Sequence, residues 1–383
     1  MGFSQALSGL NASSKNLDVI GNNIANSATT GFKSSNAQFA DVYANSKFGL
    51  GTSVSGVLQN FNSGNLESTG RNLDLAISGD GFFQFSQNGE TVYSRNGQVT
   101  MTPEGFLVNA QGAKLMGANG VIQIPEAGML SNATTKIEST VNLDSRSDII
   151  TAPFSMTDPD SYNYANTANV FDSLGNQHTV TMYYTKTAAN TWVVNSSMDG
   201  VASTSPAQNL NFTSNGSLDP AYAATNFNFP LTNGANNISF SMDYKGSTQF
   251  GSDNYQNTLV QDGYTNGQMI GVTFEKDGSV VGNYSNEQKV TLGNVEFANF
   301  RNPEGLKPLG NNVWGATAGS GQATVGTPGV GRLGGLESGV LEASNVDMTM
   351  ELVKLIVAQR SYQANAQTVK TQDEVLQQAV NLR

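Results

Sequence analysis

Apolar residues recur at helical spacing at the two ends of the chain. Near the start they form one stripe, spaced three or four residues apart with Ser14 in one of the positions, at Phe3, Leu7, Leu10, Leu17, Ile20 and Ile24. Near the end a second stripe, with a shift of phase close to Ala364, contains Val346, Met350, Val353, Val357, Val369, Leu376 and Val380. This spacing predicts an amphipathic helix at each end.

Between the two stripes the pattern changes to short strands separated by turns. Asn-Gly pairs, typical of tight hairpin turns, occur at 88–89, 96–97 and 119–120. Residues 179–184 and 238–244 alternate apolar and polar side chains, as expected of strands with one face buried. The middle of the chain is therefore predicted to be β structure.

The two predicted helices differ in quality. The first contains Gly9, Gly21 and several Asn and Ser residues, and each Gly costs about 1 kcal/mol relative to Ala, so packing must order it. The last has a candidate capping box at Ser344 and Asp347. A long helix with so narrow an apolar stripe is typical of a coiled coil. An alternative remains open, in which the two helices cover the core of one domain.

The order helix, β, β, β, helix predicts an α+β multidomain protein with two mainly antiparallel β domains nested between terminal coiled-coil helices. We expect a terminal helical domain from 1–31 plus 341–383 and an extended connector at 32–70. We further expect an inner β domain from 71–144 plus 265–340 and an outer β domain at 145–264. The stripe residues are the expected self-assembly interface.

Composition excludes several kinds of chemistry. The 383 residues contain no Cys and a single His, His178, so disulfides, thiolate sites and sites with two imidazoles are excluded. A net charge of −11 argues against a nucleic-acid partner, since phosphate binding needs clustered Lys and Arg. Residues 352–358, the most apolar stretch, are too short to enter and span a membrane. No cationic leader with an apolar run is visible, so we expect no cleaved signal peptide.

The candidate catalytic and binding motifs are weak. His178 has no Cys or second His to support catalysis. Residues 329–334 match the string G-x-G-x-x-G but follow Thr327-Pro328 and precede more Gly, whereas a dinucleotide site needs a preceding strand and a following helix. Asp158 and Asp160 lack the Gly and closing Glu of a calcium loop. We predict no enzymatic activity, no cofactor and no metal.

Residues 22–33, NNIANSATTGFK, resemble the N-terminal signature of the bacterial flagellar rod and hook protein family. Its C-terminal counterpart resembles residues 341–347, LEASNVD, and residues 356–366, IVAQRSYQANA. Its inner β domain resembles residues 94–97, SRNG, and residues 107–112, LVNAQG. Across about 145–262 the resemblance is weak and the strand pattern alone carries the prediction.

Residues 282–288, GNYSNEQ, resemble the hook members of the family in particular. The resemblance implies a structural hook subunit that polymerises with copies of itself into a curved, flexible tube, a universal joint transmitting torque from rod to filament. It implies export by the flagellar type III apparatus, location in the extracellular hook, and the distal rod, hook cap and hook-filament junction proteins as partners. Two alternatives remain open at this point: a distal rod subunit, and a secreted β-rich adhesin.

Overall fold

The computed structural model describes residues 2–42 and 49–381. The chain divides into two compact units. The helix-bearing unit comprises residues 1–126, 271–283 and 289–383, and the inserted unit comprises residues 127–270 and 284–288. The structure has a helix near each end and many mainly antiparallel strands in several sheets.

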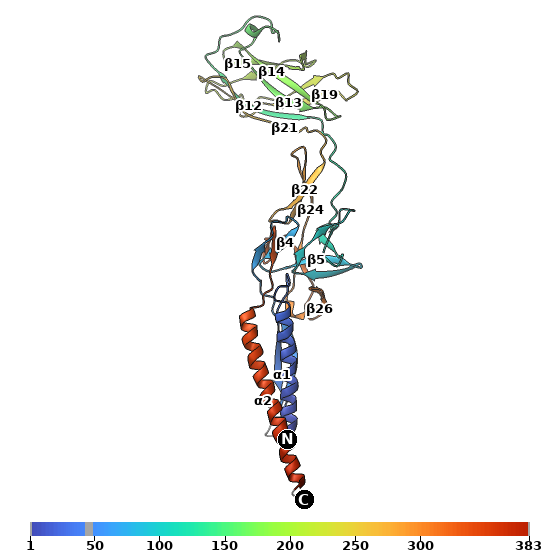
Figure 1. Cartoon of the computed structure of the whole chain (residues 1–383). Helices are drawn as coiled ribbons and strands as arrows, with labels where there is room; N and C mark the ends of the chain where they lie inside the picture. The colour runs from blue at the N-terminus through green and yellow to red at the C-terminus, as the bar shows by residue number, and fades with distance from the viewer. Residues whose placement is uncertain (1, 43–48, 382–383) are drawn as a thin grey trace. The chain divides into compact units, whose positions relative to one another are not determined.

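The two helices of the helix-bearing unit lie side by side and run antiparallel (Figure 1). They are α1 (Gly2–Ala25) and α2 (Met348–Asn381). The first helix was expected to continue to Gly31 but ends at Ala25, and residues 26–30 form turns. Gly31 has a φ of +67°, yet it does not cap α1; a Cβ there would lie 2.7 Å from the backbone nitrogen of Asn96, so it allows a close crossing of two chain segments.

The start of α2 also differs from the expectation. Asp347 is the N-cap residue itself, because its Oδ1 accepts a hydrogen bond from Met350 N–H at 3.1 Å. Ser344 lies before the helix, where its Oγ accepts from Val346 N–H at 3.4 Å. The predicted capping box is therefore wrong, and Val346 lies outside the helical stripe. The side chain of Asn345, which bonds to the carbonyl of Asn60 at 2.7 Å, holds this segment out of the helix.

A β-hairpin packs against α1 in the segment expected to be a connector. Its strands are β1 (Ser35–Asp41) and β2 (Thr52–Gln59), paired antiparallel with a register shift at Gln38 and Phe39. Residues 43–48, which join them in sequence, lie outside the described residues.

The β part of the helix-bearing unit has β5 at its centre, and the aromatic side chains of Phe83, Phe85 and Phe297 are fully buried there. A ten-stranded sheet contains β26 (Lys307–Gly310), β27 (Val313–Gly315), β6 (Glu90–Ser94), β5 (Phe82–Gln87), β10 (Lys114–Gly117), β9 (Leu107–Val108), β8 (Thr100–Met101), β11 (Gly120–Val121), β25 (Phe297–Asn299) and β28 (Thr324–Gly326). A short 3-10 helix spans Pro303–Gly305.

Three smaller sheets accompany the ten-stranded sheet. One contains β29 (Gly335–Ser338), β4 (Asp74–Ser78) and β7 (Gly97–Gln98). Another contains β3 (Leu66–Ser68) and β30 (Val340–Glu342). The third contains β22 (Met269–Phe274), β23 (Ser279–Tyr284) and β24 (Lys289–Asn294).

The inserted unit contains two five-stranded sheets with a shared apolar core. One sheet contains β18 (Thr225–Phe229), β19 (Ile238–Asp243), β12 (Lys136–Asp144), β20 (Thr248–Phe250) and β21 (Tyr255–Gln261). The other contains β13 (Tyr164–Phe171), β14 (Gln177–Ala188), β15 (Thr191–Met198), β16 (Val201–Ala202) and β17 (Gln208–Asn211). A 3-10 helix spans Pro159–Ser161.

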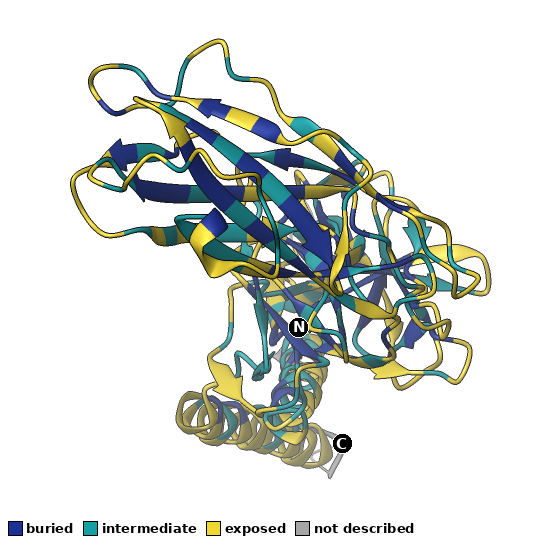
Figure 2. Cartoon of the chain, turned by 90° about the horizontal axis from the view of Figure 1, so that it is seen from above, coloured by how far each residue is buried: buried dark blue, intermediate teal, exposed yellow. Residues whose placement is uncertain are grey.

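The alternation predicted in β14 and β19 is confirmed, since Val180, Met182 and Tyr184 are buried in one and Phe240 and Met242 in the other. Figure 2 shows buried, intermediate and exposed positions changing along the strands. β12 pairs with β19, β20 and β21, so the expected boundary at residue 145 would separate it from its own sheet; the compact unit begins at Ala127.

Candidate functional site

Small side chains contribute to the contact between α1 and α2. Ala12 and Ala358 are buried beside the groove between the helices, and a Cβ added at Gly9 would lie 2.9 Å from the side chain of Asn365. Such small residues let two helices approach closely. Fourteen residues further along α1, Asn23 Nδ2 donates to Glu351 Oε2 at 3.2 Å.

Two contacts define one antiparallel register between the helices. Gly9 of α1 lies beside Asn365 of α2, and Asn23 of α1 bonds to Glu351 of α2. The two positions on α1 are as far apart in sequence as the two positions on α2, so both contacts belong to the same register. This register was not predicted from the two apolar stripes.

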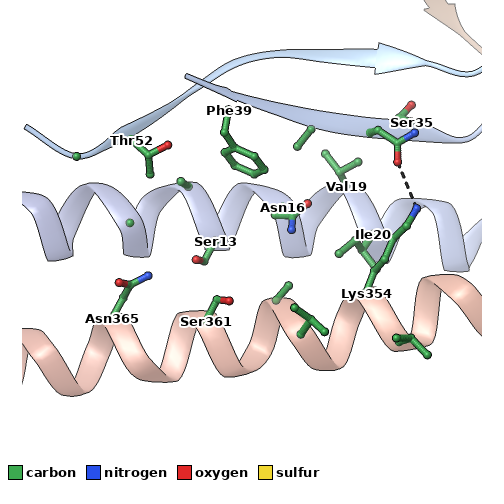
Figure 3. A pocket seen from close by; sticks show the side chains of 18 of the residues that line it. Ser13, Asn16, Val19, Ile20, Ser35, Phe39, Thr52, Lys354, Ser361 and Asn365 are labelled. Atoms are coloured by element: carbon green, nitrogen blue, oxygen red, sulfur yellow. Dashed lines mark hydrogen bonds between the residues drawn. The ribbon is translucent and has the colours of Figure 1, made fainter. Parts of the chain in front are cut away.

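A buried polar network fixes that register. Asn23 accepts from Ser35 N–H at 2.9 Å and donates to the Ser35 carbonyl at 2.8 Å, which ties α1 to the hairpin. Glu351 also accepts from Lys354 Nζ at 2.6 Å, and Lys354 reaches Asn36 Oδ1 at 3.3 Å (Figure 3). Asn23 and Glu351 are almost fully buried. Any shift along the helices would leave these polar groups without partners, at a cost of about 1–3 kcal/mol each.

A groove of about 700 Å³ lies between α1, α2 and the hairpin. Figure 3 shows Ser13, Asn16 and Phe39 directed into it from α1 and β1, and Ser361 and Asn365 from α2. Its lining is neutral apart from Lys354. The groove can bind a partner by fitting its shape and by hydrogen bonding. None of the side chains that line it is a thiol, imidazole or carboxylate.

The structure distributes the predicted stripe residues over three environments. Ile20 is buried, and Leu10, Leu17, Ile24 and Val369 are half-buried. Six others are exposed: Phe3 and Leu7 at 44%, Met350, Val353 and Leu376 at 57%, and Val357 at 58%. Val346 precedes α2 and is half-buried, and Val380 lies outside the residues whose side chains are described.

Further exposed apolar residues on α2 were missed: Leu352, Ile356, Tyr362 and Val375. They lie beside the predicted stripe, so a wider apolar face rather than a single a/d seam would have included them. The two stripes do not bury each other, and a large part of each stripe is exposed to solvent.

A second group of residues was missed as a site although the sequence motifs contain it. We call Lys33, Arg95 and Glu342 the junction cluster. Lys33 Nζ lies 2.7 Å from Glu342 Oε1, and Arg95 Nε lies 2.8 Å from Glu342 Oε2. The exposed fractions of the three side chains are 0%, 3% and 0% in that order. The three residues belong to the motifs at 22–33, 94–97 and 341–347, but nothing in the sequence shows that these three segments meet.

The electrostatics of the junction cluster follow from this burial. For Glu342, burial alone would raise the pKa, but the charges and hydrogen bonds of Arg95 and Lys33 outweigh it and lower the pKa. For Lys33, burial and the neighbouring Arg95 charge lower the pKa, against the opposing effect of Glu342.

Family models match four stretches that include these features. "Flagella basal body rod protein" matches residues 4–33, and "Flagellar basal body rod FlgEFG protein C-terminal" matches residues 337–382. "Flagellar hook protein FlgE/F/G D1 domain" matches residues 76–144, and "Flagellar basal body protein FlaE D2 domain" matches residues 142–264.

The flagellar hook protein FlgE of Escherichia coli (strain K12) is 47% identical to the chain, over 100% of both sequences. The chain belongs to the flagellar hook protein FlgE family. The FlgE of Borreliella burgdorferi is 29% identical over 98% of each chain. The crystal structure of FlgE2 from Helicobacter pylori has a TM-score of 0.56 and 14% identity, covering 72% of this chain and all of that one, so the fold is shared.

Membership of the FlgE family gives the function. The chain is a structural subunit of the flagellar hook, located in the hook, and it assembles with copies of itself within the flagellum. Its relatives are structural hook proteins, so the prediction that it is not an enzyme is confirmed. The full-length match to hook proteins decides against the distal rod and adhesin alternatives. Among the described residues, neither helix has an apolar stretch long enough to cross a bilayer.

Proposed function

We propose that the exposed apolar faces of α1 and α2 are the self-assembly interface of this hook subunit, packed against the helix pairs of neighbouring copies. The observation that carries the proposal is the exposure of apolar side chains on α2. Ala358 is buried, whereas Met350, Val353 and Val357, which border the groove, remain more than half exposed. Contiguous exposed apolar side chains of this kind mark protein–protein interaction sites.

The end of α2 supports the same assignment. In the antiparallel register fixed by Asn23 and Glu351, α2 continues past the first residues of α1 (Figure 1). The continuation carries Val375 and Leu376, 55% and 57% exposed. Because no described residue of α1 lies opposite them, we assign a second copy as their cover, and the packing of several such pairs would be a coiled coil.

The domain assignment follows from this interface. Residues 1–31 and 341–383 line the channel of the tube, and residues 32–70 connect them to the β structure. The inner β domain comprises about 71–126 with 271–340, and the outer domain extends from about 127 to 270. Surfaces rich in neutral Asn, Ser, Thr and Gly exchange hydrogen-bond partners, many through water, at small cost, which suits a curved tube whose contacts lengthen and shorten as it transmits torque.

The partners and the route follow from the same role. The tube joins the distal rod protein at its base and hook-filament junction proteins at its tip, and a hook cap protein covers its growing end. An open helical polymer requires a heterologous contact that does not close into a ring. The route that goes with this role is export through the flagellar type III apparatus without a cleaved signal peptide.

Replacing Val353 by Gln tests the interface. Gln forms helix at least as well as Val, so α2 is retained while apolar burial is lost. Full burial of such a side chain is worth about 1.5 kcal/mol or more, so we expect the critical concentration for assembly to rise about tenfold. Sedimentation and electron microscopy of the polymer measure it.

The matched control is Val201→Gln in β16. Val201 is 58% exposed and Val353 is 57% exposed, so the two substitutions remove the same apolar side chain from equally exposed positions. The control should assemble as the parent does. Equal assembly of both variants, or equal loss, would show that the helix faces are not the interface.

A further inference from the structure

The junction cluster joins chain segments that are far apart in the sequence. Glu342 ends β30, Lys33 follows the turns after α1, and Arg95 lies between β6 and β7. Besides Glu342, Lys33 Nζ donates to the Asn62 carbonyl at 2.8 Å. Arg95 donates through one terminal nitrogen to the carbonyls of Gly79 at 2.8 Å and Gly81 at 2.7 Å.

Further hydrogen bonds are made by the polar groups of the cluster. Arg95 donates to Ser63 Oγ at 3.2 Å, and Glu342 Oε1 accepts from Gly64 N–H at 2.8 Å. The backbone carbonyl of Glu342 accepts from Gly31 N–H at 2.7 Å. Five segments therefore meet on three side chains, and both helices leave from this point.

The charges of the cluster are unbalanced by one cation. Two buried cations share one carboxylate, and within the described residues no second carboxylate forms an ion pair with either of them. A buried charge that loses its partner is strongly destabilising. Removing Glu342 would leave two uncompensated cations at one point, whereas removing Lys33 would leave a neutral pair.

The carboxylate arrives on a strand that is weakly held by its own pairing. β30 pairs with β3 over three residue pairs, and the next residues are fixed by Ala343 N–H on the Asn65 carbonyl at 2.8 Å and Asn345 N–H on the Phe32 carbonyl at 3.3 Å. Without the charge of Glu342, the start of α2 is held by these bonds, by the Asn345 side chain on the Asn60 carbonyl at 2.7 Å and by the Asn23–Glu351 contact.

We propose that Glu342 is a positioning residue that latches both terminal helices to the β structure by neutralising Lys33 and Arg95. The segments after α1, around Gly64 and before α2 become ordered together when this carboxylate docks, and not separately. The latch concerns the ordering of a single subunit and does not depend on the apolar helix faces.

Hydrogen exchange on the full-length monomer tests the latch. In Glu342→Gln, which keeps size and shape, we expect the amides of Gly31, Gly64 and Ala343 to exchange together about a hundredfold faster or more, from the cost of an unpaired buried charge. Amides of β5 serve as the internal reference. Glu337→Gln is the matched control, because Glu337 pairs with Lys276 at 3.5 Å on the surface; it should leave all three rates unchanged.

Removal of Lys33 separates charge compensation from packing. Lys33→Met leaves a neutral Arg95–Glu342 pair, so we expect a much smaller effect than in Glu342→Gln. The double variant Lys33→Met/Glu342→Gln has the same excess of one cation as the parent, so adding Lys33→Met to Glu342→Gln should slow exchange again at Ala343. This rescue also tests the latch if Glu342→Gln alone does not fold.

Three outcomes would overturn the latch. Unchanged exchange in Glu342→Gln means that the carboxylate holds nothing. Equal acceleration in Lys33→Met and Glu342→Gln means that the three side chains act only by filling space. A double variant no more protected than Glu342→Gln means that charge is not the cause. Because the readout is the monomer, failure of the latch is distinguishable from failure of the helix interface, which is read from polymer.

Discussion

Substitution of Gly64 by Ala is expected to loosen the segment that connects the β structure to α2. A Cβ on Gly64 would lie 2.1 Å from the carbonyl oxygen of Ala343 and 3.1 Å from the carbonyl carbon of Ala343. To regain van der Waals separation the two backbones must move apart by about 1 Å or more. Backbone atoms occupy the space on both sides, so rotation of a side chain cannot relieve the contact.

The size of the effect follows from the bonds that this movement breaks. Gly64 N–H donates to Glu342 Oε1 at 2.8 Å, and Ala343 N–H donates to the Asn65 carbonyl at 2.8 Å. A bond to a charged acceptor is worth about 1.5–3 kcal/mol and a neutral one about 0.5–1.5 kcal/mol. The lower entropy of Ala in the unfolded chain offsets about 0.4–1 kcal/mol. We expect a net destabilisation of the helix-bearing unit of about 2–3 kcal/mol.

Urea unfolding measures this loss if one unit is observed alone. The chain has two tryptophans, Trp192 in the inserted unit and Trp314 in the helix-bearing unit. A Trp192→Phe background leaves Trp314 fluorescence as the report of the helix-bearing unit. Gly56→Ala in β2 is the control, since no heavy atom lies within 4 Å of its added Cβ, and it should not destabilise. A Gly64→Ala protein as stable as the control would refute the steric argument.

Two further predictions concern other parts of the chain. Burial alone would raise the pKa of Asp172, but hydrogen bonds from Asn176, Asn233 and Leu174 N–H hold its pKa well below the ordinary value. The stability that this carboxylate contributes is therefore complete above the pKa of Asp in the unfolded chain, about 3.9, and is lost as the pH falls below that value. Asp172→Asn should lower the stability of the inserted unit by about 1–3 kcal/mol at pH 6 and flatten its dependence on acid, as followed by Trp192 fluorescence; unchanged acid sensitivity would contradict this. Asp347→Ala should cost α2 about 1 kcal/mol by loss of the N-cap, while Ser344→Ala should cost the helix little, and exchange of the Met350 amide distinguishes the two.

Periodicity predicted the type of the main elements well. Helices at both ends and the alternation in β14 and β19 agree with the structure, because an amphipathic pattern reports which face of an element meets a core. The ends of the helices were less predictable. α1 ends at Ala25, six residues before Gly31, and the close approach of Gly31 to Asn96 depends on a segment far away in the sequence.

The sequence by itself determined the helical faces, the strands, the absence of thiol chemistry and, through the motifs at 22–33, 94–97 and 341–347, the family. Tertiary structure decided which residues meet. Lys33 and Glu342 are 309 positions apart, and of the predicted stripe residues only Ile20 is buried among those whose side chains the structure describes. Local patterns record whether a side chain prefers water or a core; the partner of a buried charge is set by the path of the whole chain, which no local pattern contains.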